Sequence, residues 1–425
     1  MTARKKPDRL QAALAAHAER YPGDSAARQA VHTVYGGAHL FRADSARKLG
    51  DLALRSLDEY APDAKTFAAA VGLAPELAVT VYDRVREKLR REPVEDFRID
   101  FEDGYGNRPD AEEDATARAA AAEVAAGMVS GALPPFLGIR IKPLSRDLHR
   151  RAVRTLELFL GALLDKTHGR LPANFVVTLP KIVVADQVAG LVAAFETLER
   201  RHKLSRGSLR LELMVETPQA LVDADGRCPL GEFVAAARGR CVAAHFGVYD
   251  YTAALDITAA EQRMQHPACD HARQVMQVAL AGTGVRLSDG ATTLMPVPRH
   301  RAPAGRSLSA EQIAANGDSV TRGWRLHYED VRHSLSAAYY QGWDLHPAQL
   351  PTRYAAVYGF FLEGLGAASL RLRRFVEQAA QATLVGDVFD DAATGQGLLN
   401  FFLRGLNCGA ITEPEALATG LSLAE

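Results

Sequence analysis

Short apolar runs alternate with longer stretches of helical periodicity along most of the chain. A strand buried on both faces gives a continuous apolar run, whereas an amphipathic helix repeats apolar residues every three or four positions. Their regular alternation predicts β–α units and a parallel sheet. Eight runs have the length and composition of strands, and they lie near residues 32–35, 97–101, 136–141, 175–179, 209–215, 241–246, 285–287 and 343–345.

Charged residues at the ends of these runs favour one way of arranging the strands. An open doubly wound sheet gathers its ligand-binding residues near one switch point, whereas a barrel collects them from the carboxyl ends of many strands. We therefore predict an α/β fold, a (β/α)8 TIM barrel. The charged residues that follow different runs are Asp103, Arg140, Lys181, Glu216, Asp250, Asp289 and His346.

The barrel pattern leaves residues at both ends of the chain. We predict an N-terminal helical lead-in over residues 1–30, the barrel over 31–351, and a helical C-terminal appendage over 352–425 with a glycine-rich interruption near 386–397. Residues 296–316 are rich in Pro, Arg and Ser, which predicts a long loop.

Composition excludes several classes of function. Fifty basic and 51 acidic residues give a net charge of −1, without long blocks of one sign, so nucleic acid and membranes are not expected partners. The four cysteines lack CxxC spacing, which is typical of a reducing compartment. No signal-peptide pattern and no long apolar span are evident, and we expect a soluble cytoplasmic protein.

Glu216 and Asp250 are the most informative acidic pair, because each follows an apolar run. Two carboxylates at neighbouring strand ends can hold one Mg²⁺, which commonly binds one or two carboxylates together with waters and substrate oxygens. The alternative is that each residue caps a helix or lies in a solvated loop.

Arg140 lies near the end of the otherwise apolar run FLGIRIKP. A buried guanidinium needs an anionic partner, because an unpaired charge in a low-dielectric site is costly. One interpretation is a structural ion pair with a carboxylate such as Asp103, and the other is a cation facing substrate negative charge. Period-two alternation places Lys142 on the same side as Arg140.

Glu102 and Asp103 are adjacent, so they point to opposite faces if the strand extends that far. One can orient Arg140 or metal-bound water while the other caps the loop. The chain has no phosphate-binding GxxxxGK[ST] motif, no zinc-binding HExxH motif and no GxSxG motif of serine hydrolases. The sequence therefore gives little support for a nucleotide-binding protein, a zinc protease or a serine hydrolase. His245, inside an apolar run, is expected to be a core residue, and His346 to orient the site or fix a turn.

Seven segments in order resemble the citrate lyase β-subunit / HpcH/HpaI aldolase family of the pyruvate/phosphoenolpyruvate-binding TIM-barrel superfamily. The resemblance covers roughly residues 95–360. The segments are IDFEDG (99–104), GIRIKP (138–143), VTLPKI (177–182), LMVETPQAL (213–221), FGVYDYTAAL (246–255), GVRLSDG (284–290) and GWDLHPAQL (342–350).

The resemblance implies roles for individual residues. The glutamate of the ET motif and the aspartate of FGxxD bind Mg²⁺ in that family, which implies Glu216 and Asp250 as metal ligands, for Mg²⁺ or alternatively Mn²⁺. It further implies that Arg140 contacts the substrate and its developing enolate, and that Glu102 and Asp103 support metal-bound water. It also implies a homo-oligomer.

The predicted activity is a Mg²⁺-dependent carbon–carbon lyase that acts through an enolate of a 2-oxo acid, a related carboxylate or an acyl thioester. Asp114 stands where the family usually has a lysine, three residues before the dipeptide Ala117-Arg118, which makes thioester substrates less secure. Two alternatives remain open. One is phosphoryl or C–O/P–C chemistry on phosphoenolpyruvate-like substrates in the same barrel, and the other is a catalytically idle assembly or regulatory barrel.

Overall fold

A computed structural model describes residues 9–23, 25, 27–302, 305–377, 383–385, 388–390 and 392–417. Eight parallel strands close into a barrel in sequence order, and β8 pairs with β1. All eight predicted strands are confirmed, and the predicted ends are displaced by a few residues at most. The strands are β1 (His32–Gly37), β2 (Asp96–Asp100), β3 (Phe136–Arg140), β4 (Phe175–Leu179), β5 (Arg210–Val215), β6 (Cys241–Phe246), β7 (Arg286–Ala291) and β8 (Gln341–Asp344).

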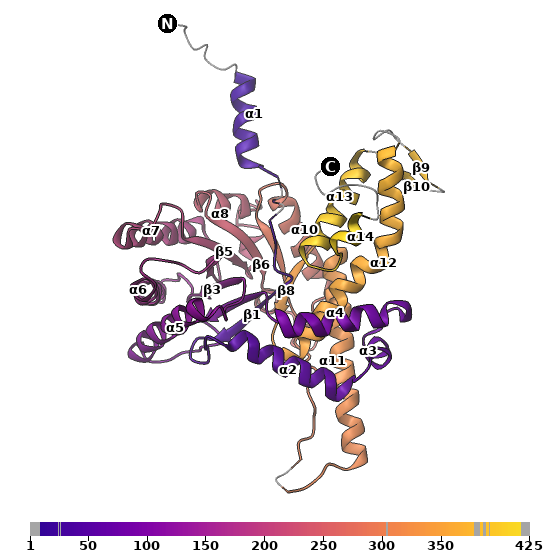
Figure 1. Ribbon diagram of the computed structural model, residues 1–425. Coiled ribbons are helices and arrows are strands. Elements are labelled where there is room, and N and C mark those ends of the chain that lie inside the picture. Colours follow the sequence, from indigo (N-terminus) through magenta and orange to yellow (C-terminus); the bar gives the residue numbers. More distant parts are fainter. Residues whose placement is uncertain are drawn as a thin grey trace.

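Helices surround the barrel and cover the outer faces of its strands (Figure 1). They follow the strands in the alternating order that the sequence predicts. The helices before the appendage are α2 (Ser45–Tyr60), α3 (Ala64–Val71), α4 (Ala78–Arg91), α5 (Asp110–Ser130), α6 (His149–Thr167), α7 (Ala185–His202), α8 (Leu230–Ala236), α9 (Val248–Ala254), α10 (Pro267–Leu280) and α11 (Ala310–Ser336). Three short 3-10 turns, η1 (Pro75–Leu77), η2 (Pro218–Ala220) and η3 (Pro347–Gln349), complete this part.

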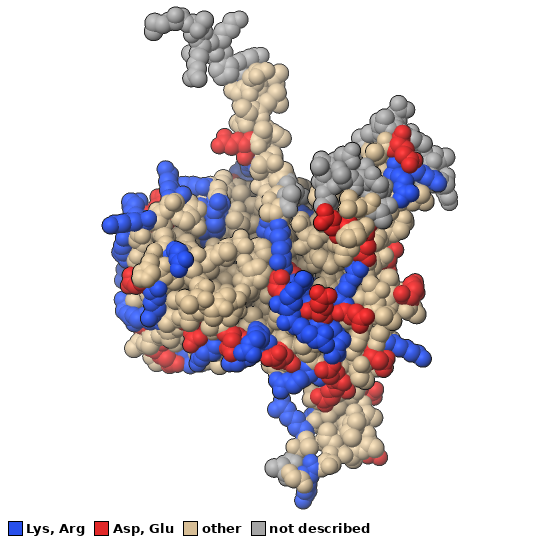
Figure 2. Space-filling view, in the orientation of Figure 1, with Lys and Arg blue, Asp and Glu red and all other residues tan. Residues whose placement is uncertain are grey.

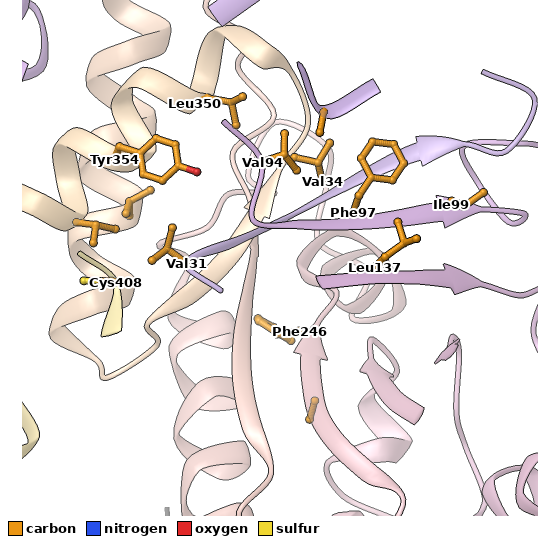
Figure 3. Packing of buried hydrophobic residues seen from close by; sticks show 14 of the residues in the cluster. Val31, Val34, Val94, Phe97, Ile99, Leu137, Phe246, Leu350, Tyr354 and Cys408 are labelled. Carbon is orange, nitrogen blue, oxygen red and sulfur yellow. The ribbon is translucent and has the colours of Figure 1, made fainter. Parts of the chain in front are cut away.

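The apolar core lies between the strands and these helices. On β1 and β2, Val34 and Phe97 are buried and belong to the same apolar cluster as Leu350 and Tyr354 of α12 (Leu350–Glu377), as Figure 3 shows. The Tyr354 hydroxyl donates to the carbonyl of Pro93 at 3.1 Å, so its polar end is also satisfied. The N-terminal part of α12 is therefore fixed to the barrel.

The inside of the barrel is polar. On β2, Asp96, Arg98 and Asp100 alternate with apolar residues, and all three are buried. Arg98 donates to both carboxylate oxygens of Glu212 on β5, at 2.6 and 2.7 Å, and His245 lies 3.2 Å from the same carboxylate. Because a buried charge needs a partner, these pairs make a charged barrel interior tolerable.

Two predicted irregular segments are shorter than expected. The loop predicted over residues 296–316 ends at Ser309, because α11 begins at Ala310 and the Ser309 hydroxyl caps it by accepting the Gln312 N–H. Within the interruption predicted near 386–397 lies β10 (Val388–Asp390), which pairs antiparallel with β9 (Thr383–Val385) just before it, and α13 (Ala392–Asn407) already begins at Ala392. Both predictions gave too much weight to the content of Pro, Gly and Ser, and too little to helix capping and to the periodicity of apolar residues.

The ends of the chain extend from the barrel. Helix α1 (Arg9–Arg20) has no buried residue and projects from the body, and α12, α13 and the short α14 (Glu413–Leu417) form an arm on one side (Figure 1). The predicted boundary between residues 351 and 352 falls inside α12, so the three-part division remains a prediction.

The surface carries both signs of charge. Figure 2 shows Lys and Arg side chains interspersed with Asp and Glu across the visible face, in line with the balanced composition. Within the described ranges, no helix is long and apolar enough to cross a lipid bilayer.

Candidate active site

Charged side chains meet at the carboxyl ends of β2 to β6. Arg140 is the last residue of β3, Glu102 and Asp103 follow β2, and Lys181 follows β4. Glu216 follows β5, and Asp250 lies in the first turn of α9, directly after β6. Because parallel strands present their carboxyl ends at one edge, side chains that are far apart in sequence gather at one end of the barrel.

A bidentate ion pair holds Arg140 in place. Its Nε and Nη2 donate to the two oxygens of Asp100, at 2.7 and 2.6 Å, and both side chains are almost completely buried. The remaining group, Nη1, lies 3.0 Å from Glu102 Oε2 and 3.6 Å from Asp103 Oδ2. Burial by itself lowers the pKa of Arg140, but Asp100 and Glu102 reverse the shift, so the guanidinium stays charged.

Two aromatic rings flank the guanidinium. The carbon at the centre of the Arg140 guanidinium lies 4.8 Å from the ring centroid of Tyr35 and 5.5 Å from that of Trp343. The two rings pack 4.3 Å apart, and they come from β1 and β8, which close the barrel. Cation–π attraction is stronger in a desolvated site, so these rings both orient the cation and shield it from water.

Lys181 occupies the centre of the acidic residues. Its Nζ lies 2.6 Å from Glu102 Oε1, 3.6 Å from Asp103 Oδ1 and 3.8 Å from Asp250 Oδ1. Burial lowers the pKa of this amine, but the surrounding carboxylates more than reverse the effect. Its backbone φ of 50° is in the left-handed region, which is uncommon for a residue with a side chain and often occurs at functional sites.

Glu216 is almost fully buried in this cluster. Its Oε1 accepts the backbone N–H of Lys181 at 2.7 Å. Burial raises the pKa of Glu216 to about 8; Lys181 opposes the shift, and the negative charges of Asp250 and Glu102 add to it. Burial also raises the pKa of Glu102, against Arg140 and Lys181. The cluster is therefore short of positive charge where Glu216 and Asp250 meet.

Gly247 explains how Glu216 reaches this position. A Cβ on Gly247 would lie 2.5 Å from Glu216 Cβ and 2.7 Å from its Oε2, closer than real contacts allow. The residue before α9 must therefore be glycine for the carboxylate to lie against the backbone that leads to Asp250.

These residues fit a divalent cation with two protein ligands. In the described part of the chain, no three His, Cys, Asp or Glu side chains converge closely enough to hold a metal ion by themselves. Mg²⁺ does not need three, since it commonly takes one or two carboxylates and completes its shell with water and substrate. Burial raises the pKa of Glu216, and the charges of Asp250 and Glu102 add to the shift; a bound cation would oppose both effects.

The structure decides two predictions about orientation. Glu102 and Asp103 were predicted to face opposite sides only if the strand extended that far; β2 ends at Asp100, so the condition is not met, and both side chains reach Arg140 and Lys181. Lys142 does not share the side of Arg140: β3 ends at Arg140, and the Lys142 Nζ turns to the Phe101 carbonyl at 2.7 Å and to Glu113 at 3.1 Å.

Other strand-end residues have structural contacts. Asp289 pairs with Arg273 at 2.8 Å, away from the cluster. His346 was expected either to orient the site or to fix a turn. It fixes a turn, because its Nδ1 accepts the Ala348 N–H. His245 is a core residue as expected, although its partners are the side chains of Glu212 and Tyr35.

Sequence reasoning missed four residues of the site. Asp100, the main partner of Arg140, could have been found from the alternating charges of DFRID, which predict charged side chains on one face of β2. Lys181 was noted only as a strand-end charge. Tyr35 and Trp343 gave no signal, because aromatic residues in strands usually belong to the core.

Comparison with solved structures finds several that are similar to this chain. A citrate lyase from Burkholderia xenovorans LB400 is 19% identical with a TM-score of 0.58, and the match covers 92% of this chain and 96% of that one. CitE from Mycobacterium tuberculosis, in complex with magnesium, acetoacetate and coenzyme A, is 16% identical with a TM-score of 0.49, covering 91% and 100%. Malate synthase from Haloferax volcanii, in a magnesium and glyoxylate complex, is 13% identical with a TM-score of 0.46, covering 90% and 99%.

The likeness to the first of these structures shows a shared barrel fold. No curated protein matches the chain by sequence. One family model covers nearly the whole sequence, from residue 10 to residue 425. The chain therefore belongs to the family described as "Domain of unknown function (DUF6986)".

Proposed function

We propose that this protein is a Mg²⁺-dependent carbon–carbon lyase that acts on a 2-oxo acid or a related carboxylate. The observation that carries the proposal is that Glu216 and Asp250 both approach Lys181, Glu216 at 2.7 Å from its backbone nitrogen and Asp250 at 3.8 Å from its Nζ, in the same cluster as the buried, ion-paired guanidinium of Arg140. The barrel it shares with a citrate lyase structure supports the same class of reaction, as do the seven sequence segments that resemble the citrate lyase β-subunit family.

Glu216 and Asp250 are the residues that would hold the cation. Bound there, the metal would supply positive charge to the keto and carboxylate oxygens of the substrate. Glu216 is suited to this role because the Lys181 N–H and Gly247 fix its carboxylate from two sides.

Arg140 would bind substrate negative charge through Nη1. Asp100 occupies Nε and Nη2, so the third edge of the guanidinium, Nη1, faces Glu102 and Asp103 in the acidic cluster. When the bond between the α- and β-carbons breaks, its electron pair passes into an enolate and negative charge grows on the enolate oxygen. The hydroxyl on the β-carbon releases its proton, and this half of the substrate leaves as a carbonyl compound. A preorganised cation at that point stabilises the transition state more than the ground state.

Glu102 and Lys181 act as positioning residues in this proposal. Glu102 joins the guanidinium of Arg140 to the amine of Lys181, so it keeps two cations at a fixed spacing. Tyr35 and Trp343 limit access of water to Arg140, which strengthens its electrostatic effect.

Substitution of the two carboxylates tests the proposal. Glu216→Gln and Asp250→Asn should abolish Mg²⁺-dependent pyruvate release from a panel of 2-oxo acid and 3-hydroxy carboxylate substrates, with rates at least ~10²-fold lower. Circular dichroism should show an intact fold. Full activity in either variant would refute the assignment.

The same assay separates the alternatives. Pyruvate released together with phosphate would favour phosphoenolpyruvate-type chemistry, and pyruvate without phosphate favours the lyase. A protein that binds no Mg²⁺ and turns over no substrate in the panel would indicate an idle barrel.

A further inference from the structure

The segment between β7 and α11, together with the first turns of α11, projects from the body of the barrel. It begins at the carboxyl end of β7, and Figure 1 shows its tip on the opposite side of the body from α1. We call residues 296–302 and 305–322 the projection. A connection from a strand to the next helix commonly takes ~2–6 residues, and longer ordered connections are usually functional.

The projection is held in shape by buried contacts with α11. The Asn316 side chain, which is 5% exposed, accepts the His300 N–H at 2.8 Å and donates to the His300 carbonyl at 2.9 Å. The Ser319 hydroxyl donates to the Val297 carbonyl at 3.1 Å. The loop therefore lies against the helix in a fixed arrangement.

The outward side of the projection is positively charged and partly apolar. Figure 2 shows Lys and Arg side chains along it. Ile313, near the start of α11, is 60% exposed, although isoleucine is among the residues most often buried. Exposed arginines outnumber exposed carboxylates in the projection, with Arg299, Arg301, Arg306 and Arg322 against Glu311 and Asp318.

A second exposed apolar surface lies at the carboxyl end of the same barrel. Single exposed apolar residues need no explanation, but a set that surrounds one end of a barrel is typical of an interaction surface. The set consists of Leu and Val side chains that follow β1, β4, β5, β6, β7 and β8, and its members are Leu40, Val183, Val184, Val222, Leu255, Leu294 and Leu345.

The connections at this end of the barrel are also acidic. Carboxylates outnumber cations in residues 216–229 after β5 and 247–266 after β6, with Glu216, Asp223, Asp225, Asp250, Asp256 and Glu261 against Arg227 and Arg263. Complementary charge steers two surfaces together and disfavours wrong partners. The positive, apolar projection and the acidic, apolar end of the barrel therefore match in both respects.

We propose that the projection binds the carboxyl end of a second copy of this chain. The partner is a second copy because one chain supplies both halves of the match. Both surfaces lie at the same end of the barrel, so two copies related by a two-fold axis can satisfy both at once, and the assembly closes. The length of the projection suits the ~20–30 residues a side of a stable interface. The arginines of each copy then lie beside the acidic connections that carry the other copy's Glu216 and Asp250.

Sedimentation equilibrium of the full chain tests the proposal. The wild type should associate reversibly, and NaCl should weaken the association because it screens the charge pairs. The double variant Arg299→Glu/Arg301→Glu and the variant Ile313→Glu should each raise the dissociation constant at least ~10-fold. The matched controls are Arg206→Glu, exposed before β5, and Val129→Glu, 87% exposed near the end of α5. Both lie toward the amino end of the barrel and should associate as the wild type does.

Two further measurements test the surface that receives the projection. Val222→Glu, at a side chain 48% exposed after β5, should weaken association as strongly as Ile313→Glu does. Hydrogen exchange of the associated wild type should be slower in the projection and in residues 216–229 and 247–266 than after dilution. Residues 203–208, before β5, should exchange alike in both states. Neither measurement uses substrate or Mg²⁺, so its outcome is independent of the lyase activity.

Several results would overturn the proposal. They are a monomer at every concentration, association that a folded Arg299→Glu/Arg301→Glu or Ile313→Glu variant leaves unchanged, and exchange protection confined to other segments. An equal loss of association in Arg206→Glu and Val129→Glu would also overturn it, because the effect would then not belong to the projection.

Discussion

At the scale of single residues, the candidate site depends on how completely Arg140 is fixed. Two hydrogen bonds to Asp100 and two flanking rings leave only Nη1 of the guanidinium, which faces Glu102 at 3.0 Å. Lysine could not replace it, because an ammonium group offers no planar fork for Asp100 and stacks less well on the rings.

Asp100→Asn should therefore weaken both the fold and the site. Breaking one partner of a buried ion pair commonly costs about 3–5 kcal/mol, since the other charge stays buried. Urea denaturation should show a loss of this size. The control is Asp44→Asn, whose surface pairs with Arg47 and Lys48 are screened by water and should contribute little. Equal effects in the two variants would mean that Asp100 does not hold Arg140.

Gly247→Ala should disturb the metal centre specifically. The added methyl would lie 2.5 Å from Glu216 Cβ, so the carboxylate must move, at a cost of about 1–3 kcal/mol. Calorimetry should show Mg²⁺ affinity reduced at least tenfold. Gly190→Ala, in α7 with nothing within 4 Å of its Cβ, should leave Mg²⁺ binding unchanged and stabilise the helix by about 0.5–1 kcal/mol. Unchanged Mg²⁺ binding in Gly247→Ala would remove the reason given for this glycine.

The candidate site residues could be named from sequence only where a charge followed an apolar run. Arg140, Glu216 and Asp250 met that condition, and the structure brings them to one end of the barrel. The contacts among them could not be predicted, because they depend on where strands stop. Two residues more in β2 and β3 would have placed Glu102 on the face of Asp100 and Lys142 on the face of Arg140.

At the scale of elements, closure of the barrel is held by Asp344 at the end of β8. This fully buried carboxylate contacts His32 of β1 at 3.0 Å, His327 of α11 at 2.9 Å and Arg353 of α12 at 2.8 Å. It therefore ties the last strand to the first strand and to two helices. Burial alone raises its pKa, but Arg353 and the two histidines hold the pKa of Asp344 well below its ordinary value.

Asp344→Asn should lower the free energy of unfolding by about 3–5 kcal/mol at pH 7. A depressed carboxyl pKa contributes stability that is fully present above the unfolded-state pKa of about 3.9 and is lost as the pH falls through the folded value. Denaturant unfolding should thus show the gap between wild type and variant shrinking below about pH 4. The exposed Asp225→Asn is the control, with little effect at any pH. A gap that widens in acid would contradict this account.

Strands were predicted well because a buried parallel strand is a continuous apolar run, whatever its neighbours are. The start of α11 was predicted several residues too late. The chain before it is rich in Pro and Arg, which is typical of a loop, and the helix begins directly after the Ser309 cap. A helix cap depends on the contact of a single hydroxyl group. In a polar segment, the sequence does not distinguish a capping serine from serines that form turns.

At the scale of the whole molecule, the barrel has two chemically different ends. The carboxyl ends of its strands gather carboxylates around Lys181 and Arg140, and the amino ends present two arginines to a cavity beside the appendage. The polar barrel interior lies between them.

A Mn²⁺ soak with anomalous diffraction tests the central claim most directly, because Mn²⁺ takes the same oxygen ligands as Mg²⁺ and can be located unambiguously. The account predicts one strong peak at the carboxyl ends of β5 and β6, bound by the carboxylates of Glu216 and Asp250. No peak there at saturating Mn²⁺, or a peak bound by other residues, would contradict it.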